Sequence, residues 1–132
     1  MEKLRVGVIG LGFIGGLHAR IWAENPSAEL VAVADINEAA AKKLAEEYHC
    51  EAYGDYNEML KRDDIDAVDI CVPEDFHVAP AVAAAKAKKD FLIEKPIAKT
   101  VAEARQITEA VKENGVRMMV AHVLKFDPRY VQ

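Results

Sequence analysis

Val6-Gly7-Val8-Ile9-Gly10-Leu11-Gly12-Phe13-Ile14-Gly15 is the stretch on which the fold of this chain depends. It joins an apolar run to glycines spaced as G-x-G-x-x-G, and an amphipathic segment follows, with Ile14, Leu17, His18 and Ile21 at helical spacing. A strand, then glycines, then a helix is the context of a dinucleotide-binding turn. A glycine-rich turn in some other α/β protein is the alternative.

Each glycine of this motif has its own expected task. Gly10 permits the tight turn out of the strand, Gly12 leaves the backbone open to a pyrophosphate, and Gly15 lets the helix pack against the strand. The helix N-terminus offers free N–H groups and a partial positive charge to the phosphates. Cofactor contacts are therefore predicted at Gly10, Gly12, Phe13, Ile14 and Gly15.

A second apolar run, residues 30–34, ends in Asp35, which lies 20 residues beyond Gly15. This is close to the spacing at which a carboxylate accepts hydrogen bonds from the adenosine ribose. Such a carboxylate repels a 2′-phosphate, and Ile36 and Asn37 supply no compensating cation. The sequence therefore predicts NAD as the cofactor, with NADP less favoured.

Composition excludes several classes of function. The chain has 132 residues and a formal net charge of -5, so it offers no basic stripe for nucleic acid. No apolar run approaches the length of a membrane span and no signal-peptide pattern is present, which predicts a cytoplasmic protein without membrane contact. Cys50 and Cys71 fit no metal or redox spacing, so no metal site is predicted.

Strand and helix signals alternate along the chain. Strands are expected over residues 4–9, 29–34, 51–53, 66–72, 90–93 and 117–123, and helices over 13–24, 38–49, 55–60, 76–88 and 101–114. Strict alternation predicts an α/β fold with right-handed crossovers. We expect a Rossmann-type doubly wound parallel sheet of about six strands in the order 3-2-1-4-5-6, formed by residues 1–123.

Lys95 is the best catalytic candidate, because it follows an apolar strand, precedes a proline and lies at the edge where such sheets bind ligands. A lysine there can polarise a substrate hydroxyl or carbonyl, or carry its proton. The alternative is a surface lysine at a strand end. Glu94 is expected to orient Lys95 or the backbone.

Other polar residues carry weaker signals. Pro73 and His77 follow the fourth strand, and His77 either lines the same edge or has a structural role at a helix N-terminus. Asp69 lies inside the strand, where a carboxylate must be paired or protonated; a structural role is favoured over catalysis. His122 either faces the site or ends the sheet. His18 and His49 are given no role.

Together these motifs resemble the N-terminal half of the glucose-fructose oxidoreductase and inositol dehydrogenase family (Gfo/Idh/MocA). The resemblance covers essentially the whole chain and is carried by residues 10–15, Asp35, Val72-Pro73 with His77, Glu94-Lys95-Pro96, and Ala121-His122 leading to residues 125–130. Glu94-Lys95-Pro96 is the most telling of these motifs.

The resemblance implies NAD(P)-dependent hydride transfer to or from a hydroxyl or carbonyl of a sugar, inositol or sugar nucleotide. It implies that Lys95 contacts the reacting hydroxyl and the nicotinamide ribose, and that Pro73, His77 and Glu94 belong to the cofactor site. This chain departs from the family at Glu74, often asparagine. It also departs at Ala121, often glycine, and at Lys125, where arginine is common.

Family members continue into an α+β domain that covers the substrate and supplies an acid/histidine pair. We expect residues 124–132 to begin the crossover to that domain, which is absent from this chain. The chain alone should then bind the cofactor without efficient turnover. A stand-alone nucleotide-binding or sensor module is the alternative; a methyltransferase would leave Glu94-Lys95-Pro96 unexplained. Apolar surface near Met118 and Val120 predicts a homo-oligomer.

Overall fold

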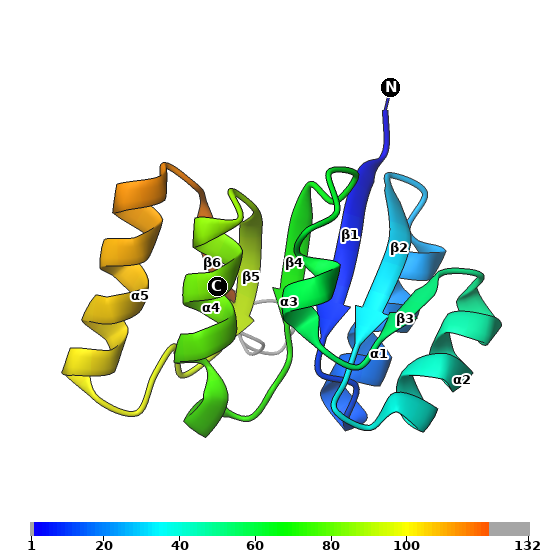
Figure 1. The fold of residues 1–132 in the computed structure, drawn as a ribbon, viewed down its shortest axis with the longest axis horizontal. Helices are drawn as coiled ribbons and strands as arrows, with labels where there is room; N and C mark the ends of the chain where they lie inside the picture. The colour runs from blue at the N-terminus through cyan, green and yellow to red at the C-terminus, as the bar shows by residue number, and fades with distance from the viewer. Residues whose placement is uncertain (1, 122–132) are drawn as a thin grey trace, which may run out of the picture.

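The computed structural model describes residues 2–121, which form one parallel sheet of six strands in the order β3-β2-β1-β4-β5-β6 (Figure 1). The strands are β1 Leu4–Ile9, β2 Ala28–Ala34, β3 Glu51–Tyr53, β4 Ala67–Ile70, β5 Asp90–Glu94 and β6 Met118–Ala121. The helices are α1 Phe13–Glu24, α2 Glu38–Tyr48, α3 Tyr56–Met59, α4 Val78–Lys86 and α5 Val101–Asn114, and a 3-10 turn, η1, spans Glu74–Phe76. The predicted fold class and strand order are confirmed.

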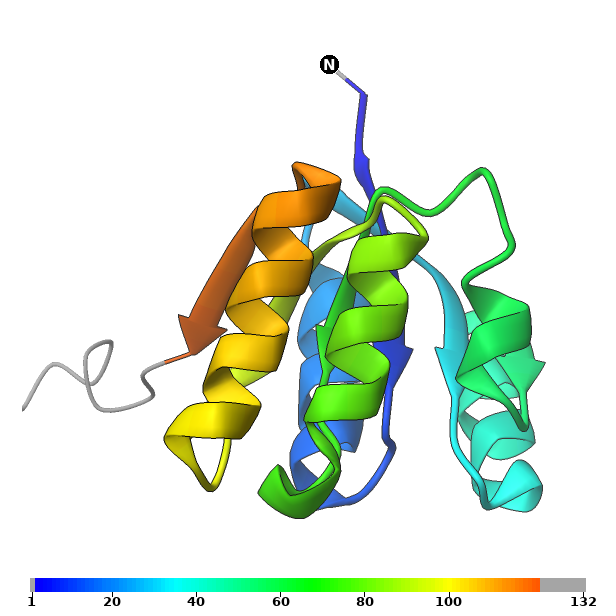
Figure 2. The ribbon, with the colours of Figure 1, turned by 60° about the vertical axis from the view of Figure 1, so that its left-hand side comes forward.

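Helices cover both faces of the sheet, with α1 and α2 on one side and α3, α4 and α5 on the other (Figures 1 and 2). Alternate strand residues therefore enter two separate cores. Val8 packs with residues of α1 and α2, whereas its neighbour Ile9 packs with residues of α4 and α5. This is the pattern expected of a parallel sheet buried on both faces.

The inward face of α1 differs from the predicted one. Gly15 and Ala19 are buried, whereas Ile14, Leu17 and Ile21 are exposed to 42%, 42% and 52%. The cause is Gly15, because a Cβ at this position would collide with the carbonyl of Gly10. The helix is rotated to bring its glycine against the turn, and His18 and Trp22 turn inward with it.

Helix caps follow the sequence signals. The Asn37 side chain accepts a hydrogen bond from Ala40 N, and Thr100 Oγ1 accepts one from Glu103 N at 3.1 Å. Gly115 ends α5 in the left-handed region, with φ of 66°. These contacts satisfy backbone groups that a helix terminus leaves free.

Two predicted elements, the helix over residues 76–88 and the strand over residues 66–72, are shorter at both ends than expected. The helix expected over residues 76–88 covers only Val78–Lys86, because residues 74–76 form η1 instead. The fourth strand begins after Asp66, whose carboxylate accepts a hydrogen bond from Arg5 N at 2.8 Å and binds the Arg5 guanidinium. His122 and residues 124–132 lie outside the described residues.

Within residues 2–121, no helix combines the length and the apolar character needed to cross a membrane.

Candidate functional site

A cleft of about 1310 Å³ lies at the carboxyl edge of the sheet. The strand arrows end at this edge, on the lower side of Figure 1. It exceeds the volume of most small-molecule pockets. Among the predicted site residues, the cleft is lined by Gly10, Gly12, Phe13, Ile14, Asp35, Pro73, His77, Glu94 and Lys95. Gly15 is buried behind the turn. The fold thus brings together positions from the ends of β1, β2, β4 and β5.

The glycine turn has the geometry that an anion requires. Gly10 has a φ of 90°, and a side chain there would meet Val72. Gly12 is the N-cap residue of α1 and makes no side-chain cap, and a Cβ added to it would meet no atom within 4 Å. The first turn of α1 is therefore open to a phosphate group, as a helix N-terminus must be to hold one.

Asp35 is held in place by backbone donors. Its Oδ2 accepts a hydrogen bond from Leu11 N at 2.6 Å, and its Oδ1 accepts one from Asn37 N at 2.8 Å. The carboxylate is half-buried beside Ile36, whose side chain is 96% exposed. A fixed carboxylate next to an exposed apolar side chain suits a ribose that carries a flat ring.

His77 is buried, with 1% of its surface exposed. Its Nδ1 lies 3.1 Å from Ile97 O, and its Nε2 lies 2.9 Å from Val72 O. The imidazole therefore ties the loop after β4 to the segment that follows Pro96. This geometry supports the structural alternative for His77, while its role in binding a cofactor stays a prediction.

Lys95 lies at the end of β5, where its side chain is exposed and lines the cleft. Its exposure and its place in the cleft wall leave the side chain accessible to a ligand. The preceding Glu94 is half-buried. The ammonium group is thus free to meet a ligand, and its catalytic role stays a prediction.

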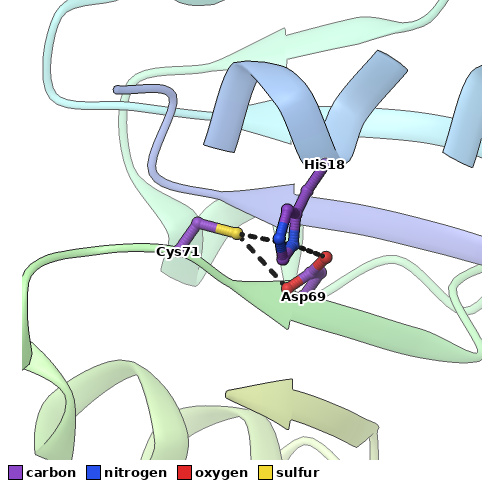
Figure 3. A group of neighbouring side chains, drawn as sticks. All are labelled: His18, Asp69 and Cys71. Carbon is purple, nitrogen blue, oxygen red and sulfur yellow. Dashed lines mark hydrogen bonds and ion pairs between the residues drawn. The ribbon is translucent and has the colours of Figure 1, made fainter. Parts of the chain in front are cut away.

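A buried polar cluster lies behind the glycine turn, between α1 and β4 (Figure 3). Asp69 Oδ2 accepts a hydrogen bond from Trp22 Nε1 at 2.8 Å and lies 2.7 Å from His18 Nδ1. The other carboxylate oxygen, Oδ1, accepts a hydrogen bond from the Cys71 thiol at 3.3 Å. The prediction that the Asp69 carboxylate is paired is confirmed, and its structural role stays a prediction. Burial of the carboxylate is compensated by these partners.

His18 also reaches Glu94, a contact that the sequence did not predict. Its Nε2 lies 3.1 Å from Glu94 Oε1, at ion-pair distance. The ring N–H is poorly aligned with that oxygen, which is buried and has no hydrogen bond within residues 2–121. The signal that could have identified His18 is its place three residues after Gly15, on the face that packs against the sheet.

Electrostatics favour a charged His18 and a neutral Cys71. The hydrogen bond with Asp69 is the largest cause that raises the pKa of His18 above 6.5, and the charges of Asp69 and Glu94 act in the same direction against burial. Burial holds the pKa of the Cys71 thiol well above its ordinary value. The cluster therefore places an imidazole of raised pKa beside two carboxyl groups.

The donor atoms of His18, Asp69 and Cys71 lie within 4.8 Å of one another. Hydrogen bonds among them account for this proximity. A protonated thiol is also a poor metal ligand. The expectation that the chain holds no metal stays a prediction.

The apolar surface of the last strand differs from the predicted one. Met118 and Val120 are half-buried and pack on the core, whereas Met119 between them is 66% exposed. Alternation along a strand explains the difference, since neighbouring side chains point to opposite faces.

Comparison with known proteins adds independent evidence. Residues 4–122 match the family described as an oxidoreductase family with an NAD-binding Rossmann fold. The chain is 37% identical over 133 aligned positions to inositol 2-dehydrogenase of Salmonella typhimurium, covering 98% of this chain and 40% of that protein. It is 35% identical to scyllo-inositol 2-dehydrogenase (NAD(+)) of Bacillus subtilis, covering 98% and 38%.

Solved structures give the same result. GenD2 from gentamicin A biosynthesis, solved in complex with NAD, superposes with a TM-score of 0.93 at 30% identity, covering 99% of this chain and 38% of that one. Apo scyllo-inositol dehydrogenase from Lactobacillus casei superposes with a TM-score of 0.89 at 26% identity, covering 96% and 38%. The chain thus spans about 40% of the length of the relatives that it matches.

Proposed function

The chain belongs to the Gfo/Idh/MocA oxidoreductase family, through its NAD-binding Rossmann domain, and on that ground we propose that it binds NAD in the cleft described above. The pyrophosphate would lie over Gly12 at the N-terminus of α1, where no side chain intervenes. Phe13 and Ile14 line the same opening. The dinucleotide-binding domain would comprise residues 1–123.

The fixed position of the Asp35 carboxylate is the observation that supports NAD over NADP as the cofactor. Two backbone N–H groups already fix its carboxylate at the end of β2, so little reorganisation is needed before it accepts ribose hydroxyls. A 2′-phosphate in the same place would meet a negative charge. Neighbouring Ile36 and Asn37 cannot offset this repulsion.

Lys95 would act on the substrate. Bound NAD would supply the acceptor for a hydride, and the ammonium group would hydrogen-bond the reacting hydroxyl or carbonyl and help to move its proton. Its exposure in the cleft suits this role. Since relatives of similar sequence are inositol dehydrogenases, we propose a polyol or sugar as the substrate class.

Cofactor binding without efficient turnover is the behaviour proposed for this chain alone, because it spans only about 40% of the length of the dehydrogenases that it matches. The competing proposal is a nucleotide-binding or sensor module with no chemistry. Assays with inositol and NAD test both proposals against an active enzyme. Detectable turnover by the chain of 132 residues would contradict the inactive cofactor-binding domain and the sensor module alike. A homo-oligomer is also proposed, on the exposed Met119 and the exposed apolar side of α1.

Titration calorimetry with NAD and, in parallel, NADP tests the binding proposal. We expect NAD to bind more tightly, and Asp35→Ala to weaken NAD binding at least about tenfold, which corresponds to about 1.4 kcal/mol. Asp63→Ala is the matched control, because Asp63 is exposed and remote from the cleft. Binding of neither nucleotide, or equal loss in both variants, would contradict the proposal.

A further inference from the structure

We propose that His18 is a positioning residue that couples helix α1 to the end of strand β5, acting as an imidazolium that bridges Asp69 and Glu94. This inference rests on the proposed function in one respect, because it gives Lys95, the neighbour of Glu94, its place in the site. The bridge itself is a property of the chain without cofactor and can be tested on that chain.

The position of His18 follows from the glycine turn. Gly15 must face the sheet, because any Cβ there would collide with the Gly10 carbonyl. His18 lies three residues further along the helix, on the same side. The feature that opens the cleft for a pyrophosphate thus also directs this imidazole at the strands beside it.

The two carboxylates come from neighbouring strands and share one face of the sheet. Asp69 of β4 is in register with Leu92 of β5, and Glu94 lies two residues beyond Leu92. Residues two apart on a strand point to the same side. Asp69 and Glu94 are therefore near each other in a poorly solvated place, where like charges repel strongly.

The contacts of the two ring nitrogens favour the doubly protonated form of the His18 imidazole. His18 Nδ1 lies 2.7 Å from Asp69 Oδ2, and Nε2 lies 3.1 Å from Glu94 Oε1. Carboxylates only accept hydrogen bonds, and a neutral imidazole carries a single N–H. Only the imidazolium carries an N–H on both sides; the one at Nε2 makes no hydrogen bond with Glu94, so the positive charge between the two acidic groups is what offsets that carboxylate.

Within residues 2–121, the ion pairs of Asp69 and Glu94 are with His18 alone. The Trp22 indole, from α1 itself, donates to Asp69 and is neutral. The Cys71 thiol, at the end of β4, also donates to Asp69 and stays protonated. Glu94 Oε1 has no hydrogen bond, so its only partner among these residues is the His18 ring.

Loss of the proton from His18 has a defined consequence. The single remaining N–H stays with Asp69, the closer acceptor, and Glu94, whose Oε1 already has no hydrogen bond within residues 2–121, loses the positive charge that lies 3.1 Å from it. Such a carboxylate is costly, so Glu94 turns towards the cleft that it lines and shifts the backbone of Lys95. Protonation of His18 thereby sets where Lys95 is presented.

The test is NMR titration of the full chain without cofactor, following the imidazole nitrogens of His18 and the side-chain Cε of Lys95, the latter assigned with Lys95→Arg. We expect both His18 nitrogens to be protonated at pH 6, and the Lys95 signal to show an inflection at the pH where His18 titrates. A neutral His18 at pH 6, or a Lys95 signal without that inflection, would overturn the proposal.

Variants separate positioning from simple charge effects. In Glu94→Gln, His18 should still titrate but the Lys95 signal should show no inflection. The variant removes the carboxylate through which His18 acts on Lys95, whereas the change in charge at His18 remains. Persistence of the full inflection in this variant would also contradict the proposal. His18→Gln should abolish the inflection, and His49→Gln, at an exposed histidine, should leave it unchanged. If His18→Gln fails to fold, the wild-type chain and Glu94→Gln still decide the matter.

Calorimetry keeps the two proposals distinguishable. Failure of the chain to bind NAD would contradict the proposed function and leave the titration of His18 and Lys95 intact. Conversely, normal NAD binding with no link between His18 and Lys95 would overturn only the present inference.

Discussion

At the Asp35 end of the cleft, backbone N–H groups hold the Asp35 carboxylate. At the Lys95 end, side-chain contacts surround the end of strand β5. Asp35 receives hydrogen bonds from Leu11 N and Asn37 N. Glu94, the neighbour of Lys95, is held from the inside by His18. Backbone amides do not titrate near neutral pH, but imidazole does. One end of the cleft is therefore fixed by the fold, and the other depends on a proton.

Substituting Gly15 should break both ends at once and has the largest expected effect. In Gly15→Ala, the new Cβ collides with the Gly10 carbonyl, so α1 must move away from the turn and take His18 with it. We expect the free energy of unfolding to fall by about 3 kcal/mol. Urea denaturation followed by fluorescence of Trp22, the single tryptophan of the chain, measures this loss.

Gly16 provides the matched control on the same helix. A Cβ at Gly16 meets no atom within 4 Å, so Gly16→Ala should be neutral or stabilising by up to about 1 kcal/mol through helix propensity. Equal stability of the two alanine variants would contradict the assigned role of Gly15.

Removing the Asp35 carboxylate should disturb only the end that is fixed by the backbone. Asp35→Ala leaves Leu11 N and Asn37 N without their acceptor, and we expect the free energy of unfolding to fall by about 1.5 kcal/mol. The loss should be the same at pH 6 and pH 8, because the donors are backbone amides. Urea denaturation at both pH values checks this, and a loss confined to one pH would refute it.

Changing pH should disturb only the other end, with a smaller effect. The pKa of His18 is raised in the folded chain, chiefly by its hydrogen bond with Asp69. The resulting stabilisation is fully present below the unfolded value near 6.5 and is lost as pH rises through the raised folded value. Relative to His18→Gln, the wild-type Tm should therefore be higher at pH 6 by a few degrees, and this advantage should shrink at higher pH.

Differential scanning calorimetry of both chains between pH 6 and pH 9 makes this measurement. His49→Gln controls for the general effect of losing a histidine, since His49 is exposed at the end of α2. An advantage of the wild-type chain that grows with pH would contradict the charged bridge.

Local patterns in the sequence predicted the elements and their order well, because strand and helix periodicities and helix caps act over a few residues. Asn37 and Thr100 cap the helices that they were expected to begin. The errors fall where a local pattern competes with a contact from elsewhere. Asp66 leaves the predicted strand to bind Arg5, and Phe76 leaves the predicted helix for η1.

The same difference between local sequence patterns and contacts from distant parts of the chain applies to the candidate site. The glycine turn, Asp35 and Lys95 could be predicted, because each occupies a marked position at the end of an apolar run. The buried position of His77 could not, since its partners are carbonyls of Val72 and Ile97 in two separate loops.

By itself, the sequence determined a doubly wound α/β fold, the strand order and the edge of the sheet at which a dinucleotide belongs. These follow from periodicity and from glycine spacing, which are local properties. Only the tertiary structure decided which face of α1 is buried, because the contact of Gly15 with Gly10 outweighs the apolar periodicity of the helix. That rotation brings His18 to Asp69 and Glu94, residues of three elements that meet only when the sheet is assembled.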